Sequence, residues 1–176
     1  MVLSLDTAES FDMVMRHYTP MVYRIAFSRL ANAVDCEDVT QEVFVRYFRA
    51  NLTYESEEHR KAWLIRCAVN TSINFVTSSH KKHSGDLENI ENYAESETLS
   101  ANVTENEFEK QQLRQTVLNA VLQLPEKYRI PVHLFYYEDL PTAQIAAITN
   151  TRESTVRSQL ARARKLLENL LKGVEF

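Results

Sequence analysis

The chain has 176 residues, of which 44% are hydrophobic and 25% charged, so it has the apolar surface for a packed core and is too ordinary in composition for a disordered chain. Only two residues are glycine, which speaks against phosphate-cradling loops, dinucleotide folds and most β-sandwiches, because these need backbone at positive φ. No long apolar run is present and the N-terminal residues include acids, so we expect neither a membrane-spanning nor a secreted protein.

The two cysteines, Cys36 and Cys67, lie in apolar-periodic segments and do not form a C-x-x-C pair. This spacing favours buried free thiols over a disulfide or a zinc site. It also indicates a reducing compartment, so we expect a cytoplasmic protein.

Charge is unevenly distributed along the chain, although the net charge is only -4. Residues 1–84 carry equal numbers of basic and acidic residues, residues 85–109 carry eight acids and no base, and residues 110–176 carry a net charge of +4. The middle segment has few large apolar residues, so it buries too little surface to offset its ordering entropy. We therefore predict two small helical domains, 1–84 and 110–176, joined by an acidic flexible linker, 85–109.

The first domain is predicted to be a bundle of three or four helices. Apolar residues at helical spacing begin at Phe11, and Thr19-Pro20 is typical of a cap followed by proline at the first helical position, so a new helix is expected there. Asp35 is the expected cap of the next helix, and a further helix is expected over residues 58–78.

The second domain is predicted to contain a helix-turn-helix. A first helix is expected to stop at Leu124-Pro125-Glu126, and Pro131 is expected to kink the next one. A short helix over residues 143–149 is followed by Asn150, which tolerates the left-handed backbone that such a turn needs. The inner face of the long helix after it is expected to consist of Val156, Leu160, Ala163, Leu167 and Leu170. The predicted fold class is therefore all-α.

The long helix is basic on the side opposite its apolar stripe. Its charged residues are Arg152, Arg157, Arg162, Arg164 and Lys165 against Glu153 and Glu168. In helix-turn-helix proteins the N-terminal part of the second helix enters the major groove of DNA. The DNA-binding candidates are therefore Arg152, Thr155, Arg157, Ser158, Gln159 and Arg162. A solvated basic face on a bundle helix is the alternative that this pattern leaves open.

Motif blocks in both halves carry a resemblance to a known family. The first half contains Asp35-Cys36-Glu37-Asp38-Val39-Thr40-Gln41-Glu42-Val43-Phe44 and Ala62-Trp63-Leu64-Ile65-Arg66 with Asn70. The second half contains Leu124-Pro125-Glu126-Lys127-Tyr128-Arg129, Tyr136-Tyr137-Glu138-Asp139-Leu140, Ile145-Ala146 and the stretch from Thr155 to Arg164. These motif blocks occur in this order on the two sides of an acidic linker. Through them the chain resembles the extracytoplasmic-function class of the bacterial sigma-70 family over nearly its whole length.

The resemblance implies a transcription initiation factor whose partners are core RNA polymerase and promoter DNA, and it leaves open an anti-sigma factor. It implies that the first block docks on the clamp helices of the polymerase β′ subunit, with a further contact to the β flap. Asp38, Gln41 and Glu42, at spacings of three and four, offer acceptors on one helical face to a basic partner. The alternative is that Glu42 pairs with Arg46 within the helix.

The stretch from Trp63 to Lys82 resembles the part of the family that captures the unpaired strand of the -10 element. The candidate residues are Arg66, Asn70, Asn74, Lys81 and Lys82. Flipping a base out costs a few kcal/mol, which stacking and a base pocket recover. Trp63 is a stacking candidate, but its apolar neighbours favour a core position. Asn74 stands where the family usually has aspartate, and Thr77 where it usually has arginine.

Further departures from the family bear on specificity. Gln159 replaces a common arginine with a group suited to bidentate pairing with adenine, and Pro141 replaces a common serine cap, so the preferred -35 element is expected to be unusual. His80 and His83 have an H-x-x-H spacing, but no cysteine or acid nearby completes a ligand set. A basic loop near DNA is favoured over a metal site, and no cofactor is expected.

Three other functions compete with that of a sigma factor. An autonomous helix-turn-helix regulator would bind DNA without polymerase, and the docking block argues against it. A helical adaptor that binds only protein would show no salt-sensitive affinity for DNA. An enzyme is the least favoured, because no convergent nucleophile and base, metal set or phosphate loop is found in the sequence.

Overall fold

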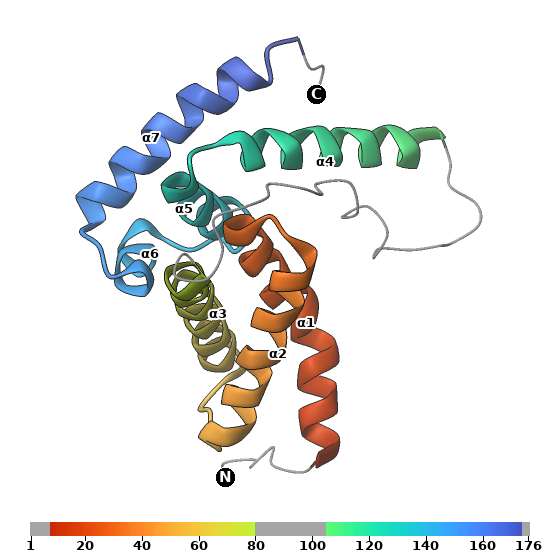
Figure 1. Cartoon of the computed structure of the whole chain (residues 1–176), viewed down its shortest axis with the longest axis vertical. Helices are drawn as coiled ribbons and strands as arrows, with labels where there is room; N and C mark the ends of the chain where they lie inside the picture. Colours follow the sequence, from red (N-terminus) through yellow and green to blue (C-terminus); the bar gives the residue numbers. More distant parts are fainter. Residues whose placement is uncertain (1–7, 80–104, 174–176) are drawn as a thin grey trace. The chain divides into compact units, whose positions relative to one another are not determined.

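The computed structural model describes residues 8–79 and 105–173, and these form seven helices and no strand (Figure 1). The predicted all-α fold is confirmed. The chain divides into two compact units, residues 1–86 (unit 1) and residues 87–176 (unit 2). Lys81, Lys82, His80 and His83 lie outside the described residues, as does most of the expected linker.

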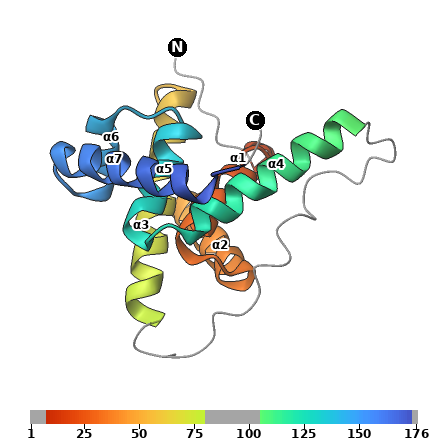
Figure 2. The ribbon, with the colours of Figure 1, turned by 90° about the horizontal axis from the view of Figure 1, so that it is seen from above.

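Unit 1 is a bundle of α1 (Ala8–Leu30), α2 (Ala33–Ala50) and α3 (Glu57–Ser79), each of which packs on the other two (Figures 1 and 2). The buried residues of α2 follow spacings of three and one, which places them on one helical face. The core of unit 1 includes Val22, Ile25, Cys36, Val39, Val43, Leu64, Ile65 and Val69. The expected helix over residues 58–78 corresponds to α3.

Pro20 lies inside α1, so the break expected after Thr19 is wrong. A proline in a helix interior removes one backbone hydrogen bond and costs about 3 kcal/mol. Val14 and Tyr18 before it and Val22 after it are all buried in the bundle. Burial on both sides of Pro20 offsets this cost and keeps the two segments in one helix.

The cap of α2 is Asn32, so the expectation that Asp35 caps this helix is wrong. Asn32 has extended backbone (φ -134°, ψ 126°), and its side-chain Oδ1 accepts a hydrogen bond from the Asp35 backbone N–H at 3.0 Å. Asp35 therefore lies in the first turn of the helix. The short connection from α1 also holds Ala31 at φ 52°, a left-handed conformation that is unfavourable for alanine.

Trp63 lies half-buried in an aromatic cluster where α2, α3 and the segment between them meet. Its ring meets those of Tyr47 and Tyr54 edge-on, with centroids 5.8 and 6.4 Å apart. Tyr54 also stacks on Tyr47, and the Arg60 guanidinium lies 5.6 Å from the Tyr54 ring centroid. These contacts agree with the interpretation of Trp63 as a packing residue.

Unit 2 contains α4 (Glu105–Gln123), α5 (Glu126–Tyr136), α6 (Thr142–Thr149) and α7 (Glu153–Leu170). Its core includes Leu124, Ile130, Leu134, Ile145, Val156, Leu160 and Ala163. Because α4 begins at Glu105, residues 105–109 of the expected linker lie in a helix. An acid-rich sequence is compatible with the first turns of a helix, since the helix dipole favours negative charge there.

The helix-turn-helix is formed by α6 and α7. Asn150 ends α6 with φ 51° and ψ 46°, which confirms the left-handed turn residue expected from the sequence. The Thr151 N–H donates to the Ala146 carbonyl at 2.9 Å and closes the turn. The apolar stripe of α7 is shorter than expected, because Leu167 is only half-buried and Leu170 is 41% exposed.

Within the described ranges, none of the helices is both long enough and apolar enough to cross a bilayer.

Candidate nucleic-acid and protein interfaces

The DNA-binding candidates of unit 2 lie along the exposed side of α7. Val156, Leu160 and Ala163 bury the opposite side of this helix. The residues Arg152, Thr155, Arg157, Ser158 and Arg162 are exposed, and Gln159 is half-buried. Arg152 directly precedes the helix as its N-cap residue. The candidates therefore share one accessible surface, and Gln159 lies at its margin.

Spacing divides this surface into two parts. Thr155, Ser158 and Arg162 follow at three and four residues and form one row, whereas Arg157 lies on the flank of the row. The Ser158 hydroxyl donates to the Thr155 carbonyl at 2.9 Å, so its oxygen is free to accept, but it must rotate before it can donate to another group. Arg162 and Arg157 bring the positive charge that phosphates attract.

The polymerase-docking candidates lie on the exposed side of α2. Asp38, Gln41 and Glu42 are all exposed, opposite the buried residues Val39 and Val43. The spacing therefore does place three acceptors on one accessible surface.

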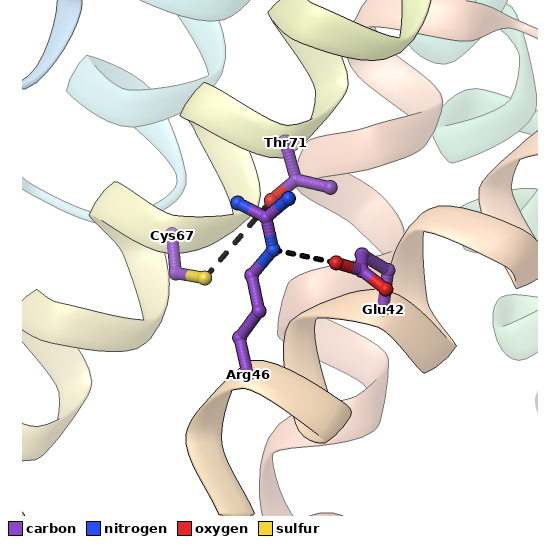
Figure 3. Close-up of polar contacts among 4 residues, drawn as sticks. All are labelled: Glu42, Arg46, Cys67 and Thr71. Carbon is purple, nitrogen blue, oxygen red and sulfur yellow. Dashed lines mark hydrogen bonds and ion pairs between the residues drawn. The ribbon is translucent and has the colours of Figure 1, made fainter. Parts of the chain in front are cut away.

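Glu42 differs from its two neighbours, because its Oε1 accepts a hydrogen bond from Arg46 Nε at 2.7 Å (Figure 3). This pair lies close to Cys67 of α3. The positive charge of Arg46 lowers the pKa of the Cys67 thiol, and the negative charge of Glu42 raises it. The i,i+4 pair weighed in the sequence analysis is thus present, while Asp38 and Gln41 have no such contact among the described residues.

The strand-capture candidates of unit 1 lie on α3. Arg66, Asn70 and Asn74 are exposed and follow at intervals of four, so they form a row along one side of the helix. The buried residues Leu64, Ala68 and Val69 hold the helix in the bundle. Lys81 and Lys82, the remaining candidates, lie beyond the described end of α3.

Both cysteines are free thiols. Burial raises the pKa of the Cys36 thiol to about 12, and burial also raises the pKa of Cys67, which is half-buried. A hydrogen-bonding contact of 4.0 Å joins Cys67 Sγ to Thr71 Oγ1 (Figure 3). In the described parts of the chain, no three His, Cys, Asp or Glu side chains gather as a metal-binding group.

Two residues beside the basic surface of α7 were not among the candidates. Glu153 lies one turn before Arg157, with Oε1 3.9 Å from Arg157 Nη2, and also accepts a hydrogen bond from Thr142. The i,i+4 spacing of Glu153 and Arg157 is visible in the sequence, where Glu153 counts only as an acid on a basic helix. The contact with Thr142 depends on the packing of α6 against α7 and has no signal in the sequence.

Two family models match the chain, one in each unit. The model described as Sigma-70 region 2 matches residues 14–82, and that described as Sigma-70, region 4 matches residues 114–167. Together these ranges include every candidate residue named above.

Curated relatives match along nearly the whole chain. The ECF RNA polymerase sigma-E factor of Escherichia coli (strain K12) is 32% identical over 165 residues, which cover 92% of this chain and 86% of the relative. The sigma-E factor of Haemophilus influenzae is 30% identical, with 92% and 87% covered.

Solved structures share the fold. The sigma factor RpoE of Bartonella quintana, crystallised with the anti-sigma factor NepR, gives a TM-score of 0.69 at 19% identity and covers 96% of this chain and 100% of that one. CnrH, solved with the cytosolic domain of CnrY, gives a TM-score of 0.60 at 16% identity, with 98% and 94% covered. At these identities the likeness concerns the fold alone.

The match to region 2 in the first half does not favour an autonomous helix-turn-helix regulator, because such a protein needs only the second unit. Both regions are present in the expected order, and the relatives that are 30% and 32% identical match over 92% of this chain. The chain therefore belongs to the sigma-70 family, as an extracytoplasmic-function RNA polymerase sigma factor that directs transcription initiation at specific promoters.

Proposed function

We propose that the two units divide the work at one promoter. Residues 1–84 bind core polymerase and open the -10 element, and the helix-turn-helix domain, predicted as residues 110–176, reads the -35 element. The observation that carries this proposal is the pair of unlike exposed surfaces, acceptor-rich on α2 and basic on α7. An acceptor-rich surface suits a basic protein partner, whereas a basic helix suits the phosphates and base edges of DNA.

The -35 element is read by Arg152, Thr155, Arg157, Ser158, Gln159 and Arg162. Support comes from the exposure of five of these six residues and from the turn at Asn150, which presents the N-terminal end of α7. The contacts divide into two kinds: arginines pair with guanine or phosphate, and Gln159 pairs with adenine.

The -10 element is opened by Arg66, Asn70 and Asn74, with Lys81 and Lys82 adding positive charge along the unpaired strand. Support comes from the row that the three α3 residues form and from its exposure. Amide side chains supply donors and acceptors to the edges of flipped bases, and lysines neutralise the phosphates between them.

Asp38 and Gln41, with Glu42, dock on the clamp helices of the β′ subunit, and the second unit contacts the β flap. An anti-sigma factor is a further partner, which is supported by the similar solved structure of the sigma factor RpoE in complex with the anti-sigma factor NepR. The protein acts in the cytoplasm, without a cofactor and without catalysis of its own, since the chemistry of RNA synthesis belongs to polymerase.

Permanganate footprinting of polymerase complexes on a linear promoter tests this division. Asn70→Ala is expected to leave the closed complex intact and to impair melting, because it removes contacts only to the unpaired strand. Arg157→Ala is expected to cost roughly 1 to 3 kcal/mol in promoter binding and to relax base preference upstream.

Matched controls are Asn169→Ala, an exposed asparagine at the far end of α7, and Arg16→Ala, an exposed arginine of α1. On a pre-opened bubble template, which needs no melting, the Arg157 variant should start transcription normally. Normal melting of duplex by the Asn70 variant, or lost transcription from the bubble by the Arg157 variant, would show that the two tasks are assigned to the wrong units.

A further inference from the structure

The two helices of the helix-turn-helix are joined at their first residues. Thr142 begins α6 and Glu153 begins α7. The Thr142 hydroxyl donates a hydrogen bond of 2.7 Å to Glu153 Oε1. Both residues are half-buried, which shields the bond in part from water. The bond therefore holds the Glu153 carboxylate in one place at the N-terminal end of the recognition helix.

The same carboxylate oxygen faces Arg157, one turn further along α7. Arg157 Nη2 lies 3.9 Å from Glu153 Oε1, and the arginine side chain is 65% exposed. At this distance the contact is an ion pair and not a hydrogen bond, so it leaves the N–H donors of the guanidinium to DNA. The negative charge still favours one direction for a long, exposed side chain.

An acid at this end of α7 opposes DNA binding in general, because it repels phosphates beside a basic surface. Negative charge in a first turn stabilises a helix, but that effect requires neither a bond to α6 nor an arginine one turn away. A fixed carboxylate beside an arginine has a further consequence. It restricts the rotamers of the guanidinium, so that bidentate pairing with a base edge costs less side-chain entropy.

We propose that Glu153, anchored by Thr142, is a positioning residue that sets the base preference of Arg157. This inference rests on the proposed role of α7 as the reader of the -35 element. The carboxylate directs the guanidinium toward a base edge that offers two acceptors, as guanine does through O6 and N7. Its charge also weakens binding to DNA that lacks this base. Glu153 thus increases discrimination between sequences more than it increases affinity.

The test uses holoenzyme assembled from the full chain and core polymerase, with a pool of linear duplex promoters whose -35 element is randomised. Sequencing bound and unbound DNA measures base preference at each position, and the bound fraction measures total affinity. Glu153→Gln keeps an acceptor for the Thr142 hydroxyl and removes the charge. It should reduce preference about three- to tenfold at the position that Arg157→Ala also relaxes, without lowering total binding.

Variants at Thr142 separate the anchor from the charge. Thr142→Val should reduce preference at the same position, because the carboxylate is no longer held, whereas Thr142→Ser keeps the hydroxyl and should behave as the unmodified protein. Glu168→Gln is the matched control, since it removes an exposed acid from the far end of α7. It should leave base preference unchanged.

A double variant decides between positioning and direct reading. In the Arg157→Ala background, Glu153→Gln should have no further effect on base preference, because the two residues act on one contact. A separate loss at another position would mean that Glu153 itself accepts from a base, as carboxylates do from cytosine N4, and would overturn the positioning role.

The inference would also be overturned if Arg157→Ala relaxes base preference and Glu153→Gln leaves it unchanged. If Arg157→Ala itself leaves preference unchanged, the proposed function of α7 fails instead, so the two failures are distinguishable. Far-UV circular dichroism of each variant establishes that helix content is intact, and the isosteric Glu153→Gln remains decisive if Thr142→Val unfolds.

Discussion

The exposed surfaces of α2 and α7 are built alike and carry opposite charge. Each lies on an amphipathic helix whose other side is buried, through Val39 and Val43 in α2 and through Val156 and Leu160 in α7. The exposed residues of α2 include Glu37, Asp38, Gln41 and Glu42, followed by Arg46 and Arg49 toward its end, whereas those of α7 include Arg157, Arg162, Arg164 and Lys165. The same helical scaffold thus presents acceptors in one unit and cations in the other, which suits the two different partners proposed above.

The largest effect is expected from reversing the charge of the α2 surface. In the double variant Asp38→Lys and Gln41→Lys, two acceptors become cations that face a basic partner, and such juxtaposition costs on the order of several kcal/mol. We expect loss of co-purification with core polymerase at unchanged helix content. Binding at the level of the unmodified chain would exclude this surface as the docking site.

The acidic segment predicted as a linker, residues 85–109, should weaken DNA binding by the free protein. Amides in place of Asp86, Glu88, Glu91, Glu95 and Glu97 remove negative charges that we expect to compete with phosphates for the basic surface of α7. We expect duplex affinity of the free chain to rise about tenfold at low salt and to fall steeply as salt increases.

Fluorescence anisotropy over a salt series measures this effect. Asp12→Asn with Glu55→Gln, which removes two exposed acids from unit 1, shows how much affinity changes per negative charge removed outside the segment. An affinity that does not change when the segment is neutralised would mean that its charge plays no part in DNA binding.

The turns that precede the two helices should respond oppositely to substitution. Ala31 at φ 52° precedes α2, and Asn150 at φ 51° lies in the turn before α7. Ala31→Gly should stabilise unit 1 by about 0.5 to 1 kcal/mol, because glycine adopts this backbone without strain, and Asn150→Ala should destabilise unit 2 by about 1 kcal/mol.

Urea unfolding of the full chain distinguishes the two turns. The single tryptophan, Trp63, lies in unit 1, so its fluorescence follows that unit alone, while circular dichroism follows both. Ala31→Gly should shift the fluorescence transition, and Asn150→Ala should shift only the dichroism. A fluorescence shift in the Asn150 variant would show that the units do not unfold independently.

The smallest expected effect separates Glu42 from its neighbours on α2. Glu42→Gln removes an exposed ion pair with Arg46 and should cost unit 1 about 0.3 to 0.5 kcal/mol. Asp38→Asn should leave stability nearly unchanged and weaken polymerase binding more than Glu42→Gln does. The Trp63 unfolding transition and a polymerase pull-down measure the two quantities, and a reversed order in the pull-down would identify Glu42 as the main docking acceptor.

Local spacing in the sequence determined those features of the molecule that depend only on residues close together along the chain. Helical periodicity predicted both amphipathic surfaces, because residues three and four apart share a side of any α-helix. Asn150 was identified as a left-handed turn residue, since few residue types other than glycine tolerate that backbone. The rows on α3 and α7 follow from the same spacing and needed no knowledge of packing.

Tertiary structure decided what depends on contacts between helices. Pro20 is held inside α1 because residues on both sides of it are buried, and Leu170 is exposed because the buried stripe of α7 ends earlier than its apolar sequence. The bond from Thr142 to Glu153 exists only because α6 packs on α7. Sequence periodicity identifies the side of a helix that is apolar, but only the neighbouring helices determine how much of that side is covered and which polar residues meet across it.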